Sequence, residues 1–149
     1  MLLAIDVGNT NTVFGLYEGA EMLGSFRIST NASSTSDEIG MMIMQYYHFR
    51  GYDAKETTAV IIASVVPPVM YSLTNAIRKY FGINPVIVGE DVDVGVENHY
   101  INPREVGVDR LVNAVAAIQK YGAPLIIVDI GTAITFDCID QNGDRKSVV

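Results

Sequence analysis

A short pattern that occurs twice constrains the fold of this 149-residue chain more than any other feature. Residues 4–12 read AIDVGNTNT and residues 127–135 read IVDIGTAIT. Each segment is an apolar strand followed by aspartate, an aliphatic residue, glycine and a small polar residue, and each runs into a second β-prone stretch. The two aspartates, Asp6 and Asp129, stand 123 positions apart. Gly19 and Gly143 follow at similar places in the next turns. A repeat of domain length predicts two domains built on one plan.

The chemistry of the repeated motif favours phosphate binding. A strand that ends in aspartate places a carboxylate at the edge of a sheet, where it can hold hydrated Mg²⁺ or orient a water molecule. The glycine lets a phosphate approach the backbone closely, and the following Asn9 or Thr132 supplies a hydrogen-bond donor. The alternative is that both segments are merely tight turns, and the repetition argues against it.

The remainder of the chain alternates between strand and helix patterns. Strands are expected at residues 2–6, 12–17, 22–29, 58–64, 86–88 and 125–128. Helices are expected at residues 39–49 after Ser36 as N-cap, at 67–81, and from Asn102 and Pro103 to Gly122. The resulting order, β-β-β-α-β-α-β-α-β, predicts an α/β fold with a mixed, mostly parallel sheet. We expect the first domain to cover residues 1–122 and a second to begin at residue 123.

Composition excludes several classes of function. The net charge is -7 and no Lys/Arg run is present, which argues against nucleic acid and anionic membranes as partners. The apolar runs at residues 59–66 and 124–130 are far shorter than the roughly 20 residues of a membrane span. The N-terminus lacks the basic region of a signal peptide. The single cysteine, Cys138, is interpreted as a buried thiol. These features together predict a cytoplasmic protein.

Four motifs in their order and spacing resemble the type III pantothenate kinases, a family of the acetate kinase/hexokinase/actin superfamily. The motifs are DVGNTN at residues 6–11, SVVPP at 64–68, GVDR at 107–110 and DIGTA at 129–133. The third is preceded by Tyr100 and Pro103 and followed by Asn113. Val108 stands where the family usually has alanine. The resemblance implies a ribonuclease H-like, actin-like ATPase fold.

The resemblance also implies a reaction, the transfer of the ATP γ-phosphoryl group to the primary hydroxyl of pantothenate, the first step of coenzyme A biosynthesis. Asp109 matches the family's general base, a role open to an aspartate because this side chain is ordinarily ionised at neutral pH. Arg110 has the fork geometry to clamp the pantothenate carboxylate. Tyr100, Gly107 and Val108 match further substrate-pocket positions.

The nucleotide site implied by the resemblance involves both copies of the repeat. The phosphate loop matches Asp6, Val7, Gly8, Asn9, Thr10, Asn11, Thr12 and Val13. Asp6 is the expected Mg²⁺ partner and Thr132 a further nucleotide contact. Asp129 matches the position associated with a monovalent cation, potassium or ammonium. A homodimer is expected, because family members complete the pantothenate pocket with residues of a partner subunit.

The last residues depart from the family pattern. Members continue past a turn like Asn142-Gly143 into a Gly-Gly segment and a full second domain, whereas Arg145, Lys146 and Ser147 do not resemble the expected strand. The second sheet is therefore expected to keep two partial strands, and the chain alone to have little or no kinase activity. A separately expressed piece, a frameshift and a premature stop would all give this pattern.

Two alternatives remain open. A non-catalytic regulatory or binding homologue would share the family's sequence pattern, although the intact Asp6, Asp109 and Arg110 argue against it. Another kinase of the superfamily, acting on a sugar or on acetate, is disfavoured by the GVDR segment followed by Asn113.

Overall fold

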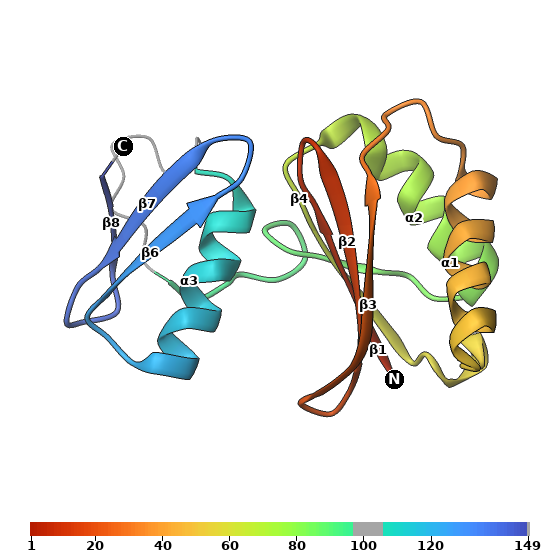
Figure 1. Cartoon of the computed structure of the whole chain (residues 1–149), viewed down its shortest axis with the longest axis horizontal. Coiled ribbons are helices and arrows are strands. Elements are labelled where there is room, and N and C mark those ends of the chain that lie inside the picture. The colour runs from red at the N-terminus through yellow and green to blue at the C-terminus, as the bar shows by residue number, and fades with distance from the viewer. Residues whose placement is uncertain (97–105, 149) are drawn as a thin grey trace. The chain divides into compact units, whose positions relative to one another are not determined.

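The computed structural model describes residues 1–96 and 106–148, and the chain divides into two compact units (Figure 1). The first unit is Met1–Asp91 and the second is Val92–Val149. The first contains β1 (Leu2–Val7), β2 (Asn11–Glu18), β3 (Glu21–Ser29), α1 (Ser36–Arg50), the 3₁₀ turn η1 (Ala54–Glu56), β4 (Ala59–Ser64), α2 (Pro67–Phe81) and β5 (Val86–Ile87). The second contains α3 (Val108–Tyr121), β6 (Leu125–Ile130), β7 (Ile134–Ile139) and β8 (Arg145–Val148).

A five-stranded mixed sheet forms the first unit, with strand order β3-β2-β1-β4-β5. The central strand β1 pairs antiparallel with β2 and parallel with β4, in a register that places Val7 beside both Thr12 and Ser64. Strand β5 adds a second parallel pair. The mixed α/β sheet expected from the order of elements is therefore confirmed. The C-terminal end of β1 lies at the same end of the sheet as the start of β2.

Helices α1 and α2 cover one face of this sheet (Figure 1). Alternate side chains of β1 point to that face because successive residues of a strand face opposite sides. The core side chains on it are almost fully buried: Leu3, Ile5, Val7, Phe14, Leu16, Val60 and Ile62 from the strands, with Ile39, Ile43, Tyr47, Val69, Leu73, Ala76 and Ile77 from the helices. The helical members recur every three or four residues, which is the spacing of one face of an α-helix.

Helix α1 begins one residue earlier than predicted. Thr35, not Ser36, is its N-cap: the Thr35 hydroxyl accepts the N–H of Glu38, and the Glu38 carboxylate accepts the N–H of Thr35. This reciprocal pair needs glutamate three residues after the cap, and Ser36 would have had Ile39 there. The bond from the Thr35 N–H lowers the pKa of Glu38. Helices α1 and α2 end, as expected, at Gly51 and Gly82, both in the left-handed conformation.

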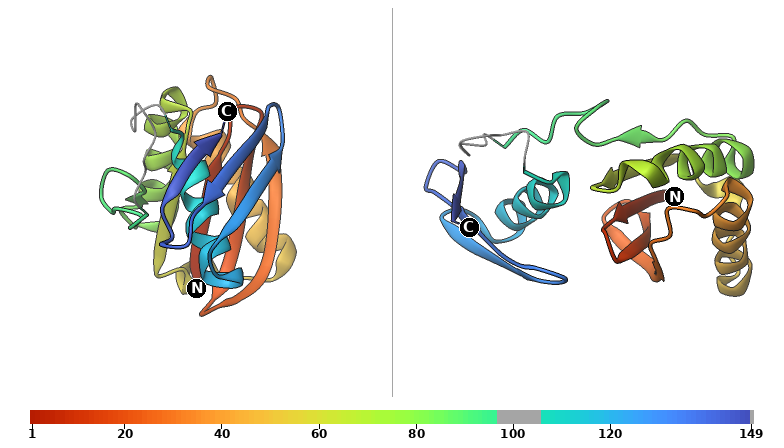
Figure 2. Two further views of the ribbon diagram at one scale, coloured as in Figure 1. Left: turned by 90° about the vertical axis from the view of Figure 1, so that its left-hand side faces the viewer. Right: turned by 90° about the horizontal axis from the view of Figure 1, so that it is seen from above.

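The second unit is a three-stranded antiparallel sheet, β6-β7-β8, with α3 packed on β6 and β7 (Figure 2). Two expectations were wrong here. Residues 145–148 do form a strand, because their backbone completes an antiparallel ladder with β7. Helix α3 begins at Val108 instead of at Asn102 and Pro103, which lie outside the described residues.

Contacts within the chain divide it between Asp91 and Val92, so that α3, which packs on β6 and β7, lies in the second unit. This division by contacts does not test the expected boundary of the repeated domains after residue 122. The duplication itself stays a prediction. No helix in the described part of the chain is long and apolar enough to cross a membrane.

The packing of α1 on the sheet yields a stability test. Ile43 of α1 is completely buried, whereas Met41 of the same helix is 63% exposed. We expect Ile43→Ala to lower the free energy of unfolding by about 2–5 kcal/mol, because it removes buried methyl groups and leaves a cavity. Met41→Ala should leave it nearly unchanged. Urea unfolding followed by circular dichroism measures both, and equal effects would contradict the assigned core.

Candidate functional site

The turn between β1 and β2 holds the first predicted site. Asp6 lies near the end of β1 with an exposed side chain, and residues 8–11 form the turn that follows. The N–H of Gly8 donates to the Asn11 carbonyl at 3.0 Å, and a Cβ at Gly8 would lie 3.2 Å from that oxygen. A side chain at this position would therefore crowd the turn. Asn9, Thr10 and Asn11 are exposed around it, as a phosphate-binding loop requires.

Thr30, directly after β3, braces this turn and was missed by sequence reasoning. Its hydroxyl donates to the Gly8 carbonyl at 2.6 Å, and its N–H donates to the Thr10 carbonyl at 2.9 Å. The Thr12 hydroxyl lies 2.9 Å from the Thr30 hydroxyl. Since the Thr30 proton is used on Gly8, Thr12 is the donor in that contact. A threonine after a strand gives no distinctive sequence signal, because the contact depends on strand register.

The ends of the parallel strands β1 and β4 meet beside this turn. The N–H of Val65 donates to the Val7 carbonyl at 3.1 Å, and the Ser64 hydroxyl accepts the N–H of Val66 at 3.1 Å. Ser64 thus shapes the passage from β4 into α2. In open α/β sheets ligands bind outside the carboxyl ends of the strands, and Asp6 stands at that edge.

The second copy of the motif forms the turn between β6 and β7. Asp129 and Thr132 are exposed there, and the N–H of Gly131 donates to the Ala133 carbonyl at 3.0 Å. The pairing of Ile130 with Ile134 leaves three residues in this turn, whereas the pairing of Val7 with Thr12 leaves four in the first. The second turn is therefore one residue shorter, a difference that the sequence comparison alone did not reveal.

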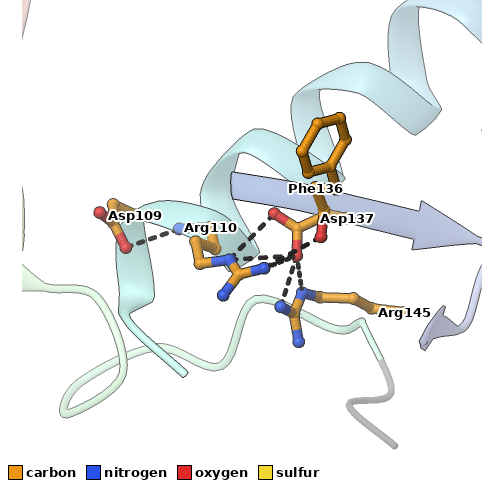
Figure 3. Close-up of polar contacts among 5 residues, drawn as sticks. All are labelled: Asp109, Arg110, Phe136, Asp137 and Arg145. Carbon is orange, nitrogen blue, oxygen red and sulfur yellow. Dashed lines mark hydrogen bonds and ion pairs between the residues drawn. The ribbon is translucent and has the colours of Figure 1, made fainter. Parts of the chain in front are cut away.

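The start of α3 carries the predicted catalytic residues. Gly107 precedes the helix, and Val108, Asp109 and Arg110 form its first turn, all partly buried. Asp109 accepts the N–H of Arg110 through Oδ1 at 2.8 Å. A carboxylate is favoured at this end of a helix because the backbone N–H groups and the helix dipole are positive there. In Figure 3 the Asp109 carboxylate points away from the guanidinium of Arg110.

A buried carboxylate holds Arg110 in place (Figure 3). Arg110 Nε and Nη2 donate to Asp137 at 3.0 and 2.8 Å, and Nη2 also donates to the Phe136 carbonyl at 3.1 Å. Arg145 donates through Nε to the same carboxylate at 2.7 Å and pairs with it through Nη2. Asp137 is 2% exposed and Arg145 is fully buried. Two guanidinium groups thus share one carboxylate.

The structure places the predicted residues in two groups. Asp6 and residues 7–13 lie in the first unit, and Gly107, Val108, Asp109, Arg110, Asp129 and Thr132 lie in the second. Tyr100 lies outside the described residues. Sequence reasoning missed Asp137 and Arg145 as partners of Arg110. The alternation of β7 already placed Asp137 among apolar neighbours, and a lone carboxylate in such a strand is the signal that a buried ion pair would leave.

The described residues include no group of three or more His, Cys, Asp or Glu side chains that could hold a metal by themselves. Mg²⁺ in phosphoryl-transfer sites is ordinarily bound by one or two carboxylates together with substrate phosphates and water. A single exposed carboxylate such as Asp6 or Asp129 therefore fits a cation that arrives with the nucleotide.

Comparison with known proteins identifies relatives over almost the whole chain. The family model described as type III pantothenate kinase matches residues 2–147. A curated protein of that name from Myxococcus xanthus is 46% identical over 144 residues, 97% of this chain and 56% of that protein. Another of the same name, from Geobacillus kaustophilus, is 50% identical over 142 residues, 95% of this chain and 55% of that protein. The chain spans about half the length of the curated relatives it matches.

Solved structures share the fold at low sequence identity. A reductive activator for a corrinoid, iron-sulfur protein matches 94% of this chain and 29% of its own length, with a TM-score of 0.61 and 15% identity. A proposed N-acetylglucosamine kinase from Porphyromonas gingivalis matches 100% of this chain and 47% of its own length, with a TM-score of 0.53 and 20% identity. These likenesses concern the fold alone and support an actin-like type of mixed α/β sheet.

The cluster around Asp137 gives the second test. We expect Asp137→Asn to lower the free energy of unfolding by about 3–5 kcal/mol, because it removes the buried carboxylate that Arg110 and Arg145 both bind. Asp37→Asn is the matched control, since Asp37 pairs with Lys79 on the surface, where both side chains are more than half exposed. It should change stability little. Thermal unfolding compares the two, and an unchanged midpoint in Asp137→Asn would contradict the structural role of the cluster.

Proposed function

Because this chain belongs to the type III pantothenate kinase family, we propose that it carries one part of an enzyme that phosphorylates pantothenate with ATP. The observation that carries the proposal is the start of α3, where Asp109 and an anchored Arg110 stand side by side. Phosphoryl transfer needs mainly positioning of the reactants and stabilisation of charge. A fixed carboxylate and a fixed guanidinium supply both for the substrate that accepts the phosphoryl group.

Asp109 acts in this proposal as the general base. Its carboxylate accepts the proton of the pantothenate hydroxyl as the hydroxyl oxygen attacks the γ-phosphorus and the bond to the β-phosphate oxygen breaks. The first turn of α3 holds it partly buried and turned away from the Arg110 guanidinium. The helix therefore orients the Asp109 carboxylate, and this carboxylate is not engaged in an ion pair with the Arg110 guanidinium.

Arg110 binds the pantothenate carboxylate in the same proposal. The Asp137 carboxylate and the Phe136 carbonyl accept hydrogen bonds from Nε and Nη2 of Arg110. The orientation of the guanidinium plane is therefore set before substrate binds. Gly107, Val108 and Tyr100 are proposed as further walls of the pocket. Val108 narrows that pocket relative to the alanine usual in the family.

ATP binds, in this proposal, to the turn at residues 8–11, with Asp6 through Val13 as its phosphate loop. Asp6 would hold Mg²⁺, which neutralises the phosphate charge when bound. Thr132 would contact the nucleotide, and Asp129 would hold potassium or ammonium. The repeated motif supports the further proposal that β6 and β7 begin a second domain resembling the first. The family resemblance also supports a cytoplasmic homodimer.

The test of the proposed chemistry is a kinase assay on the native gene product with pantothenate, Mg²⁺-ATP and potassium. We expect Asp109→Asn to lower kcat by about 10²–10⁴, the usual contribution of a general base. Asp93→Asn is the control, because Asp93 is an exposed loop carboxylate. Pantothenate should still raise the melting temperature of the Asp109→Asn variant, since binding does not need the base.

Other outcomes separate the alternatives. Pantothenate-dependent stabilisation without turnover in the native product would support a binding homologue instead of an enzyme. Turnover with glucose or acetate and none with pantothenate would contradict the proposed substrate. Turnover that survives Asp109→Asn unchanged would remove Asp109 from the mechanism.

Thr30 allows a separate test of the phosphate loop. We expect Thr30→Val to raise KM for ATP about 3–10-fold, as for the loss of about one hydrogen bond's net free energy, with little change in KM for pantothenate. Thr58→Val is the matched control, because the Thr58 hydroxyl bonds the Met1 carbonyl, at the opposite end of β1 from this turn. Equal effects of both variants on KM for ATP would contradict the role of Thr30 in shaping the loop.

A further inference from the structure

Strand β3 is an outer strand of the first sheet. The order β3-β2-β1-β4-β5 gives it one neighbouring strand, β2, so its other edge is not covered by a strand of this sheet. With nine residues it is also the longest strand of the five. Unpaired backbone N–H and C=O groups on such an edge are a template for a strand of another chain, and native proteins usually obstruct them.

The pairing of β3 with β2 identifies which backbone groups line this edge. The N–H of Thr30 donates to the Thr10 carbonyl at 2.9 Å, so Thr30 directs its backbone groups at β2. The register continues without a shift over residues 24–29. Successive residues of an antiparallel strand direct these groups to alternate edges. The even-numbered residues 24, 26 and 28 therefore face β2.

The carbonyls of Leu23 and Ser25 consequently lie on the outer edge. The N–H groups of Gly24 and Phe26 face β2, and each shares a peptide unit with the carbonyl of the residue before it. Because the C=O and N–H of a trans peptide point in opposite directions, these two carbonyls point away from β2. A strand added to this edge would need them as hydrogen-bond acceptors.

Three side chains from α1 and the segment just after it bind these two carbonyls. The Tyr46 hydroxyl donates to the Ser25 carbonyl at 3.2 Å. Arg50 Nη2 and the Tyr52 hydroxyl donate to the Leu23 carbonyl at 3.3 and 3.1 Å. We call Tyr46, Arg50 and Tyr52 the edge strap. It comes from the helix that lies beside β3 in Figure 1, and its donors take the places of an added strand's N–H groups.

Gly24 leaves the space that the edge strap needs. A Cβ at Gly24 would lie 2.7 Å from the Tyr46 hydroxyl oxygen and 3.4 Å from Arg50 Nη2. Gly24 has no positive φ, so its backbone conformation does not itself require glycine. The Tyr46 ring stacks on Phe26 with centroids 4.1 Å apart, which holds the hydroxyl above this space. The missing side chain and the donors thus belong to one contact.

We propose that the edge strap closes β3 to strand addition, and that the strand it excludes is β3 of a second copy of this chain. Two identical edges can pair about a two-fold axis because each presents the same groups to the other. Glu21 and Arg27 are exposed near opposite ends of β3, so antiparallel pairing brings opposite charges together. The inference uses neither ATP, nor pantothenate, nor Asp109.

A variant with an open edge tests the proposal. Tyr46→Phe, Arg50→Met and Tyr52→Phe together remove the three donors and keep the rings and the long side chain. The probe is a fluorescent synthetic peptide with the sequence of residues 21–29, and its anisotropy measures binding. We expect the open-edge variant to bind it about tenfold more tightly than the wild-type chain, equivalent to one or two net hydrogen bonds. Light scattering should show about twice the wild-type mass at high concentration, as for pairing of two copies.

A matched control removes the same chemical groups elsewhere. Tyr71→Phe, Arg78→Met and Tyr121→Phe together delete two hydroxyls and one guanidinium. Both tyrosines are more than 70% exposed, and Arg78 bonds the side chain of Asn84. This control should bind the peptide as the wild-type chain does.

Two further variants locate the contact. Gly24→Ala keeps all three donors but displaces the Tyr46 hydroxyl, so it should tighten peptide binding about two- to fivefold, as for loss of part of one hydrogen bond. Arg27→Pro, added to the open-edge variant, should abolish the gain. Arg27 directs its N–H at the outer edge, and proline has no N–H to offer.

Three results would overturn the proposal. One is an open-edge variant that is folded by circular dichroism and binds the peptide no more tightly than the matched control. Another is a gain in binding that survives Arg27→Pro. The third is peptide binding without any rise in mass above that of the wild-type chain, which would exclude a second copy as the occupant. Should the open-edge variant fail to fold, Gly24→Ala decides alone, and wild-type affinity in it would contradict the role of the strap.

Discussion

The buried carboxylate of Asp137 is the constraint on which the second unit depends. It joins β7 to α3 through Arg110 and to β8 through Arg145. Carrying charges out of water is costly, and the cost is offset only when each charge is paired in good geometry. The cluster therefore fixes which face of the sheet receives α3, and it orients Arg110 at the same time. In the proposed function, Arg110 would thus serve both in this structural pairing and in substrate recognition.

The turn between β1 and β2 and the start of α3 offer different kinds of local chemistry. The turn at residues 8–11 presents backbone groups at the carboxyl end of β1. The Thr30 hydroxyl, which contacts the Thr12 hydroxyl, donates a hydrogen bond to the Gly8 carbonyl of this turn. The start of α3 presents a carboxylate and a guanidinium on a rigid helix. A phosphoryl donor suits the first arrangement and an anionic acceptor alcohol suits the second.

The sequence predicted the element order and the mixed sheet, because apolar periodicity and glycine stops are local signals. The predicted phosphate loop and the Asp109-Arg110 pair came from motif resemblance, and their functional roles stay predictions. The start of α1 was wrong by one residue because a reciprocal cap depends on Glu38 as well as on the cap itself. The partners of Thr30 and Asp137 could not be predicted, since they are distant in sequence and are set by strand register and helix placement. The strand at residues 145–148 was missed because an arginine is an unusual core residue; Arg145 is buried and pairs with Asp137.

Cys138 gives the β6–β7 hairpin a built-in chemical reporter. It is the sole cysteine of the chain, and it lies half-buried on the hairpin face that it shares with Ile126, Val128 and Phe136. The equivalent position of the first hairpin is the fully buried Leu16. Thiol-reactive reagents attack only where they can reach the sulfur, so the rate at which Cys138 is alkylated would measure how much of the time this surface is covered.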